Sequence, residues 1–286
     1  MFQFSRNDQD RAFAWVHFLN AFFSSLCVAL IFVFLLKESI SFLKIVNVQQ
    51  LFSQSWYPLE NQFNMLPMFV GSLLLGLLAL FLAIPLAFFA AIFHVFYCPS
   101  FFKQVFRAIV ELYTGIPSVI FGFWGLMNLV PFIAKFKAPG FSLLAGVLIL
   151  ALMIFPIICL SLIESLEIKK KSWQKVASSL AIRKETYLWK VLLPNLKSDF
   201  ASSSLLALGR AIGETMAVLM VCGNIVQVPK SFFEPLRALT SNIALEMAYA
   251  DGLHRSSLFF SGMILFLLVG ILFFLSHKVV DYADKT

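Results

Sequence analysis

The chain has 286 residues, of which 60% are hydrophobic and only 13% are charged, and its mean hydropathy is +0.88. Soluble domains are roughly 45–50% apolar and about 25% charged, so this composition excludes an ordinary soluble protein and indicates an integral membrane protein. The net charge of +7 does not by itself indicate a nucleic-acid partner, because in a membrane protein the positions of Lys and Arg carry the information. We expect membrane lipid, and no nucleic acid, around this chain.

The four cysteines and four histidines form no disulfide or metal-binding pattern. They are Cys27, Cys98, Cys159, Cys222, His17, His94, His254 and His277. The cysteines lie in or at the ends of apolar segments without Cys-x-x-Cys spacing, and the histidines are too scattered for a ligand set. We therefore predict cysteines that pack as small apolar residues, structural or interfacial histidines, and no metal site.

The N-terminal part, residues 1–65, is predicted to be a transmembrane anchor followed by the first external loop. Residues 12–36 carry no charge over 25 positions. That is longer than the roughly 20 residues needed to cross a bilayer and than the 7–15 of a signal-peptide core. Residues 37–65 form a polar connection in which Trp56 and Tyr57 fit the membrane–water interface.

Residues 66–97 are predicted to form one long second helix, which Pro85 kinks and the sequence Cys-Pro-Ser at 98–100 ends.

The third predicted span, residues 112–134, is interrupted by several glycines and prolines. Broken backbone is tolerated at membrane depth only where protein or a wet cavity satisfies the freed polar groups. We therefore predict that the backbone at Gly115, Pro117 and Ser118 lines a pathway. The alternative is a kink that serves only helix packing.

Three more apolar spans are predicted at residues 138–163, 200–222 and 258–277, separated by a basic connection at 164–199 and a 35-residue loop at 223–257. Six spans place both termini on one side. That side carries fourteen Lys and Arg residues and the opposite loops carry seven, so the positive-inside rule makes both termini cytoplasmic. The 223–257 loop then becomes external, and residues 281–286 form a cytoplasmic tail.

Arg210 and Glu214 are the only charged residues between positions 200 and 229. A charge at the bilayer centre costs roughly 2.5–3.5 kcal/mol on insertion scales, so such residues indicate a functional site. Their spacing of four predicts that both side chains project from one helix face. We predict a substrate pathway formed by Arg210, Glu214 and the adjacent Thr215. The alternatives are a permanent ion pair that fastens two helices, and a Thr215 hydroxyl that bonds its own backbone.

The connection at 170–194 is predicted to form short amphipathic helices beneath the membrane, because its apolar residues recur at helical intervals. Leu193 and Pro194 close it, and Lys175, Ala177 and Ala181 precede them. The segment resembles the coupling loop of ATP-binding-cassette (ABC) importer permeases, which docks an ATPase. The resemblance lies in the spacing of its apolar residues and in this Leu-Pro ending. That family has Glu where this chain has Lys175 and Gly where it has Ala181. The alternative is an interfacial helix held by acidic lipids.

Further motifs make the resemblance specific. They are Glu-Leu-Tyr-Thr-Gly-Ile-Pro-Ser-Val-Ile-Phe-Gly at 111–122, Leu-Gly-Arg-Ala-Ile-Gly-Glu-Thr-Met-Ala-Val at 208–218, Gly-Asn at 223–224 and Phe-Glu-Pro-Leu-Arg-Ala-Leu-Thr at 233–240. In number, order and spacing they are similar to those of the phosphate-specific ABC permeases of the PstC type. The resemblance implies a type-1 (MetI-like) permease domain over residues 66–280, including the coupling loop at 164–199, in a multi-pass protein of the bacterial cytoplasmic (inner) membrane.

The resemblance also implies partners. These are a second, homologous permease of the PstA type, a dimer of PstB-type ATPases and an external phosphate-binding protein. The chain contains no Gly-x4-Gly-Lys-Ser/Thr sequence, so ATP and Mg would be held and hydrolysed by the partner, and the chain itself would bind no cofactor and not be an enzyme.

Other functions remain open at this point. The chain resembles permeases enough that sulfate, molybdate or phosphonate is an alternative substrate. An intramembrane enzyme using Glu214 would need a nucleophile or metal set that the sequence lacks. A phosphate sensor would bind the ATPase without transport.

Two further sets of basic residues have open roles. Arg237, in the predicted external loop, is expected to be solvated, to guide phosphate or to dock the binding protein. Residues 169–171 are expected to touch the ATPase or lipid head groups.

Overall fold

The computed structural model describes residues 6–47, 50–53, 55–179, 182–183 and 186–283. Its α-helices are α1 Arg6–Leu43, α2 Gln50–Ser53, α3 Leu66–Ile92, α4 Ser100–Thr114, α5 Ser118–Trp124, α6 Val130–Ala134, α7 Leu143–Ser179, α9 Lys197–Gly213, α10 Met216–Val221, α11 Leu239–Glu246 and α12 Gly252–Ala283. Three π-helical segments are Phe93–Tyr97, Gly125–Leu129 and Tyr187–Leu192, and two 3-10 turns are Pro58–Glu60 and Pro194–Leu196. The strands β1 Trp56–Tyr57 and β2 Gln62–Phe63 pair antiparallel.

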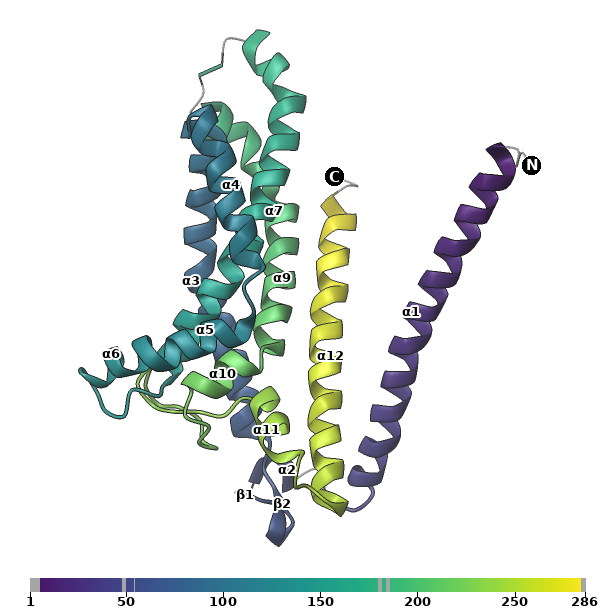
Figure 1. The fold of residues 1–286 in the computed structure, drawn as a ribbon, viewed down its shortest axis with the longest axis vertical. Helices are drawn as coiled ribbons and strands as arrows, with labels where there is room; N and C mark the ends of the chain where they lie inside the picture. The colour runs from purple at the N-terminus through teal and green to yellow at the C-terminus, as the bar shows by residue number, and fades with distance from the viewer. Residues whose placement is uncertain (1–5, 48–49, 54, 180–181, 184–185, 284–286) are drawn as a thin grey trace.

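Among the described residues, four helices are long and apolar enough to cross a membrane: Phe13–Leu43, Leu66–Tyr97, Leu143–Lys171 and Gly252–Lys278. They correspond to the first, second, fourth and sixth predicted spans, which confirms an all-α integral membrane protein. The first turns of α1 and the last turns of α12 point toward the end of the molecule that carries the α7 to α9 connection (Figure 1). The count of six spans and the cytoplasmic placement of the termini stay predictions.

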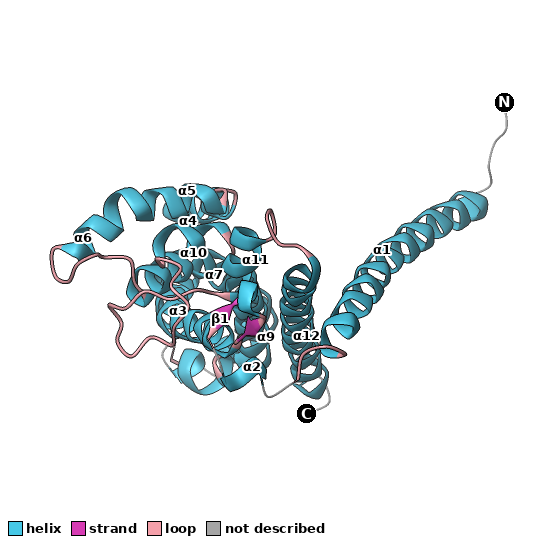
Figure 2. Ribbon diagram, turned by 90° about the horizontal axis from the view of Figure 1, so that it is seen from below, coloured by secondary structure: helices cyan, strands magenta, loops and turns pink. Residues whose placement is uncertain are grey.

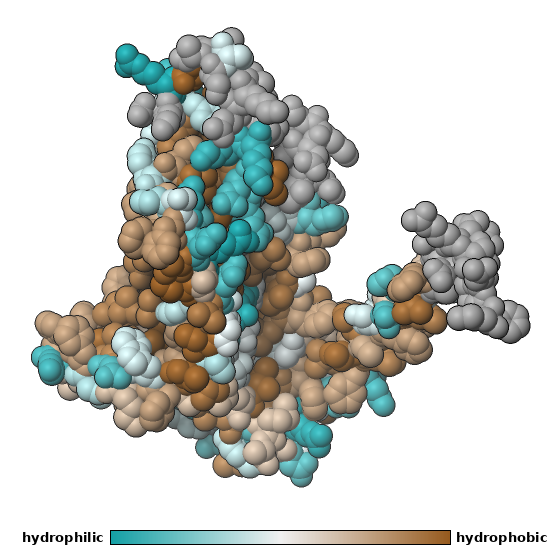
Figure 3. Space-filling view, turned by 45° about the horizontal axis from the view of Figure 1, so that its top comes forward, coloured by the Kyte–Doolittle hydropathy of each residue, from teal (hydrophilic) through white to brown (hydrophobic). Residues whose placement is uncertain are grey.

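The long helices form a bundle with one outlying member. α3, α4, α7 and α9 run side by side, α12 lies next to α9, and α1 stands at the outer edge (Figure 1). Seen from below, α1 slants away from α12 (Figure 2). The two meet through aromatic pairs, including Phe34 with Phe259 and Phe42 with Phe260. On the face shown in Figure 3, hydrophobic side chains cover most of the middle of the molecule, as a lipid-facing surface requires.

The bundle core is the contact between α3 and α7. A row of small residues on α3, spaced by four, is fully buried: Ala79, Ala83, Ala87 and Ala91. Small side chains let helix backbones approach closely, and close packing replaces the hydrophobic driving force that lipid does not provide. Ile149 and Ile158 of α7 are fully buried in the same cluster.

The third predicted span, residues 112–134, is interrupted as its glycines and prolines predicted, but the helix before the interruption begins earlier, at Ser100. α4 ends at Thr114, and the chain turns by 90° before Ser118–Ala134, which runs across the bundle (Figure 1). The reason is local: Pro117 has no N–H to donate and pushes the preceding residue out of the helical conformation. Residues 100–114 form a helix, α4, that packs on α7.

The connection after α7 combines a continued helix with a compact turn. α7 extends to Ser179, so the predicted separate helix within 170–179 is wrong. The following segment buries Tyr187, Leu188 and Leu192, as the apolar rhythm predicted, and burial raises the pKa of the Tyr187 hydroxyl. Ala181 lies outside the described residues.

The predicted external loop folds back onto α7. Three backbone N–H groups at the start of α7 would lack partners within the helix. Ser142 N–H donates to the backbone carbonyl of Val221. Leu143 N–H donates to the backbone carbonyl of Glu234, and Leu144 N–H donates to that of Phe232. The loop also contains α11, so it is a structured cap on the bundle.

α5 packs directly on α10 through glycine. A Cβ built at Gly122 would lie 2.8 Å from the Cα of Ala217, and one built at Gly125 would lie 2.9 Å from Val221 Cγ1. Since Gly122, the fifth residue of α5, lies on Ala217 at the start of α10, and Gly125 lies on Val221 one turn further along it, the two short helices run in the same direction.

We expect Gly122→Ala to destabilise the protein by about 1–3 kcal/mol, because the added methyl group meets the α10 backbone, which cannot rotate away. Thermal unfolding of the purified protein in detergent measures this. Gly270→Ala is the matched control, since nothing lies within 4 Å of a Cβ there. Equal unfolding temperatures for the two variants would contradict the tight α5–α10 contact.

Candidate functional site

The helix that carries Arg210 ends before it reaches Glu214. α9 stops at Gly213, Glu214 is extended with φ −69° and ψ 132°, and α10 begins at Met216. The predicted continuous span over 200–222 is therefore wrong, and so is the prediction that the two charges share one helix face. A spacing of four places two side chains on one face only where the helix continues unbroken, and this helix ends at Gly213.

The side chain of Glu214 stabilises the break. Its Oε1 atom accepts a hydrogen bond of 3.3 Å from the N–H of Ala217, in the first turn of α10. A carboxylate that accepts such a bond satisfies one of the N–H groups that a helix leaves free at its start. Glu214 thus belongs structurally to α10, whereas Arg210 belongs to α9.

Arg210 is open in this structure. The side chain is exposed, and the part of the chain that the structure describes provides it with no hydrogen bond or ion pair, Glu214 included. Thr215 is half-buried, and its hydroxyl donates to the Gly213 carbonyl at 3.4 Å, which is the backbone bond considered as the alternative for this residue. An exposed guanidinium at this depth is available to an anion or to a partner chain.

The second predicted pathway segment lies close to the first. Gly115 and Pro117 are exposed and Ser118 is half-buried, at the bend between α4 and α5. Because α5 and α10 run in the same direction, the bend before α5 and the break before α10 lie at the same end of this helix pair. The structure therefore brings together two interruptions that are about a hundred residues apart in the sequence.

The candidate coupling residues lie at the opposite end of the bundle. Lys175 and Ala177 are on the last turns of α7, Leu193 is half-buried, and Pro194 is exposed at the start of a 3-10 turn. Nearby, Lys169 donates to Asp199 and to the Asn195 carbonyl, which ties α7 to α9. In this structure Lys169 is a contact between helices, and the predicted contact of residues 169–171 with the ATPase or lipid stays a prediction.

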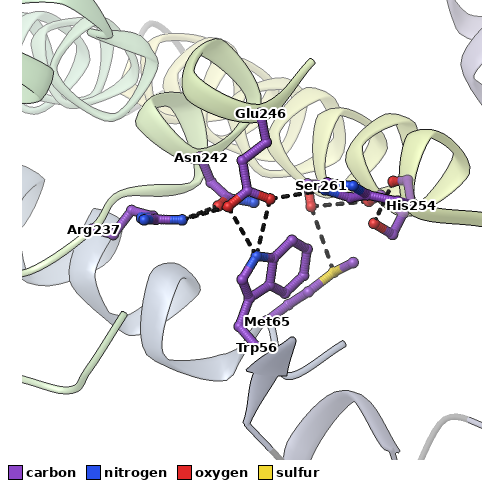
Figure 4. A network of polar contacts seen from close by, with 8 residues as sticks. Trp56, Met65, Arg237, Asn242, Glu246, His254 and Ser261 are labelled. Atoms are coloured by element: carbon purple, nitrogen blue, oxygen red, sulfur yellow. Dashed lines mark hydrogen bonds and ion pairs between the residues drawn. The ribbon is translucent and has the colours of Figure 1, made fainter. Parts of the chain in front are cut away.

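A third polar site was not predicted. The Glu246 cluster consists of Trp56, Arg237, Asn242, Glu246 and His254 (Figure 4). The buried Glu246 carboxylate accepts from Trp56 Nε1 at 3.0 Å and from Arg237 Nη1 at 2.6 Å, and contacts His254 Nε2 at 2.8 Å. Arg237 also donates to Asn242 Oδ1 and to the Asn224 carbonyl.

The expectation that Arg237 would be solvated is wrong, since only 18% of its side chain is exposed. A cavity of about 510 Å³ opens beside the cluster, lined in part by Trp56, Asn224 and Arg237. Trp56 and Glu246 are 190 residues apart, so no local spacing rule joins them. The one sequence signal was a carboxylate in the apolar segment around α11.

No group of three or more His, Cys, Asp or Glu side chains that could hold a metal occurs within the described residues.

The fold and the interrupted helices define an inner-membrane permease, and comparisons with known proteins identify the family. The chain matches the family described as "Binding-protein-dependent transport system inner membrane component" over residues 83–283 and therefore belongs to it. It is a transmembrane transport component and not an enzyme. Family membership implies an ATPase and a binding protein as partners.

Individual relatives extend the comparison. The chain is 31% identical over 256 residues to the phosphate transport system permease protein PstC of Pasteurella multocida, covering 82% of this chain and 80% of that one. It is 34% identical to the probable ABC transporter permease protein YqgH of Bacillus subtilis, covering 83% and 79%. Among solved structures, the inward-facing MetNI methionine ABC transporter matches with a TM-score of 0.59 at 17% identity, over 74% of this chain and 93% of that one. That likeness shows the type-1 permease fold.

We expect Glu246→Ala to lower the free energy of unfolding by about 3–5 kcal/mol, because it leaves the Arg237 guanidinium buried without its carboxylate. Thermal unfolding in detergent checks the loss. Glu60→Ala removes an exposed carboxylate from the neighbouring 3-10 turn and should change stability by less than about 0.5 kcal/mol. Similar unfolding of both variants would show that the cluster contributes nothing to stability.

Proposed function

We propose that this chain is a permease subunit of an ATP-driven importer that moves inorganic phosphate across the cytoplasmic membrane. The observation that carries the proposal is the similarity, over about four-fifths of both chains, to permeases named for phosphate transport. Family membership supplies the transport class, and the names of these relatives supply the anion.

The exposed Arg210 is the residue suited to the anion. A phosphate that crosses a low-dielectric region needs a compensating charge, yet must not be held so tightly that it stays. A guanidinium offers two parallel donors to phosphate oxygens and remains charged at every physiological pH. Arg210 has these donors uncommitted within the described chain.

Glu214 is suited to control Arg210 between passages. Its carboxylate is held in the structure by a single bond of 3.3 Å to Ala217 N–H, which is longer than the usual 2.9–3.0 Å. A shift at the break would free it to pair with Arg210. In this proposal Arg210 alternates between Glu214 and the passing anion, while Thr215 and the backbone at Gly115, Pro117 and Ser118 line the route.

The partners proposed are a second permease of the PstA type, a PstB-type ATPase dimer and an external phosphate-binding protein. The ATPase would bind and hydrolyse ATP with Mg. It would dock on the coupling residues Lys175, Ala177, Ala181, Leu193 and Pro194.

The second candidate function is transport of sulfate, molybdate or phosphonate by the same subunits. All three are oxyanions to which a guanidinium can donate hydrogen bonds.

We expect Arg210→Met to reduce phosphate uptake about 10- to 100-fold in vesicles that contain the whole transporter, because hydrogen bonds to a charged group contribute roughly 1.5–3 kcal/mol. Arg210→Lys should be intermediate, since it keeps the charge but loses the paired donors. Arg255→Met, at an exposed position on α12, is the control. Co-purification of the ATPase and second permease reports assembly. An assembled Arg210→Met transporter with wild-type uptake would contradict the carrier role.

We expect unlabelled phosphate to suppress uptake of labelled phosphate, and a tenfold excess of sulfate, molybdate or phosphonate to leave it nearly unchanged. Reconstituted vesicles supplied with ATP and the soluble binding protein provide the measurement. If one of the other anions suppressed uptake more strongly than unlabelled phosphate does, that anion would be the proposed substrate instead.

A further inference from the structure

α11 is an eight-residue helix whose two ends meet the two polar sites described above. Its first turn contacts the break at Glu214, and its last residue is Glu246, at the centre of the cluster in Figure 4. Thr240 and Glu246 are six residues apart, which is about 9 Å along a helix axis. The membrane site and the external cluster are thus joined by one short rigid element.

At the first end, Thr240 completes the backbone bonding of the break. Its hydroxyl donates to the Glu214 carbonyl at 2.9 Å, and the Thr240 side chain is 8% exposed. A helix break leaves carbonyl groups without partners inside the helix, and such groups are costly at membrane depth. Thr240 supplies this partner from another element.

α11 is also fixed against α3 at this end. The backbone N–H of Leu239 donates to the hydroxyl of Ser72 at 2.9 Å. A Cβ at Gly71 would lie 3.0 Å from the Arg237 carbonyl, so the glycine is what allows the segment before α11 to lie so close. The position of Thr240 is therefore set by packing on the bundle core.

At the other end, the Glu246 carboxylate is held by three side chains from separate parts of the chain. Trp56 comes from the β-hairpin, Arg237 from the loop before α11, and His254 from the first turn of α12. A change in any of these contacts acts on the last turn of α11.

We propose that Thr240 is a positioning residue for the Glu214 break, and that α11 links its geometry to the Glu246 cluster. With the cluster intact, α11 holds Thr240 against the Glu214 carbonyl and keeps the carboxylate of Glu214 on Ala217. When the cluster is loosened, α11 shifts and the break opens. This inference rests on the proposed function only for its effect on transport, because the link itself is structural.

The first experiment tests the link without transport. Hydrogen exchange is measured by mass spectrometry on the assembled transporter in detergent. Thr240→Val removes the hydroxyl at nearly constant volume and should speed exchange in peptides covering 213–219 about fivefold, the effect of one hydrogen bond. Ser241→Ala is the matched control, since the Ser241 hydroxyl is buried without a partner among the described residues.

The second arm loosens the distant end. Trp56→Phe keeps an aromatic ring beside Phe63 but removes the donor to Glu246, and should also speed exchange in 213–219. Tyr57→Phe, at an exposed position on the same strand, should not. Unchanged exchange at 213–219 in either Thr240→Val or Trp56→Phe would overturn the proposal, as would equal changes in the controls.

The third arm measures phosphate uptake. Thr240→Val and Trp56→Phe should each lower the maximal rate about threefold or more at an unchanged half-saturating concentration of loaded binding protein. The maximal uptake rate of the double variant should equal that of the slower single variant, because both substitutions act through α11. If the two effects were independent, their fold-losses in rate would multiply. Multiplying losses would overturn the link. If the wild-type transporter did not move phosphate, the proposed function would be wrong, but the hydrogen-exchange result at residues 213–219 would still test the link through α11.

Discussion

The structure depends on satisfying backbone polar groups where helices break inside a membrane. A continuous helix satisfies itself, but lipid offers no hydrogen bonds to a broken one. At Glu214 the missing partners come from the Glu214 side chain and from Thr240 of α11. At the bend before α5, Pro117 has no N–H that would need a partner. Both breaks can therefore persist, and they create the irregular backbone beside Arg210.

Close helix contact is what brings the two breaks together. α5 has Gly122 where it crosses α10, and Gly125 follows directly after α5, so the backbones approach to a distance that any larger side chain would prevent. The loop after α10 then caps the start of α7 and leads into α11. One consequence is that the 223–257 loop contacts the break at Glu214 through a single short helix, α11. The loop is part of the site's support and not merely a connection.

The sequence predicted what depends on average hydropathy and missed what depends on particular contacts. The span 66–97 was predicted with its observed bounds, because its apolar run ends at Cys98 and Pro99. The interruption at Gly115–Pro117 was predicted from its glycine and proline, although its 90° bend was not. The break at Glu214 was missed, since a long apolar window looks the same whether the helix is straight or broken. Trp56 meets Glu246 across 190 residues, which no periodicity encodes. Arg210 itself was found because a charge in an apolar run is rare.

The two arginines nearest these sites are in opposite states, and the contrast bears on function. Arg237, in the loop before α11, is mostly buried and is neutralised by Glu246, so it has the contacts of a structural residue. Arg210, in the apolar part of the chain, is exposed and has no acidic partner among the described residues. A residue kept only to fasten helices would have its counter-ion within the same fold, because an uncompensated charge is most costly there. Among the described residues no acidic side chain compensates Arg210, so in this structure its guanidinium is free for the transported anion, for water or for a partner chain, as the proposed role requires.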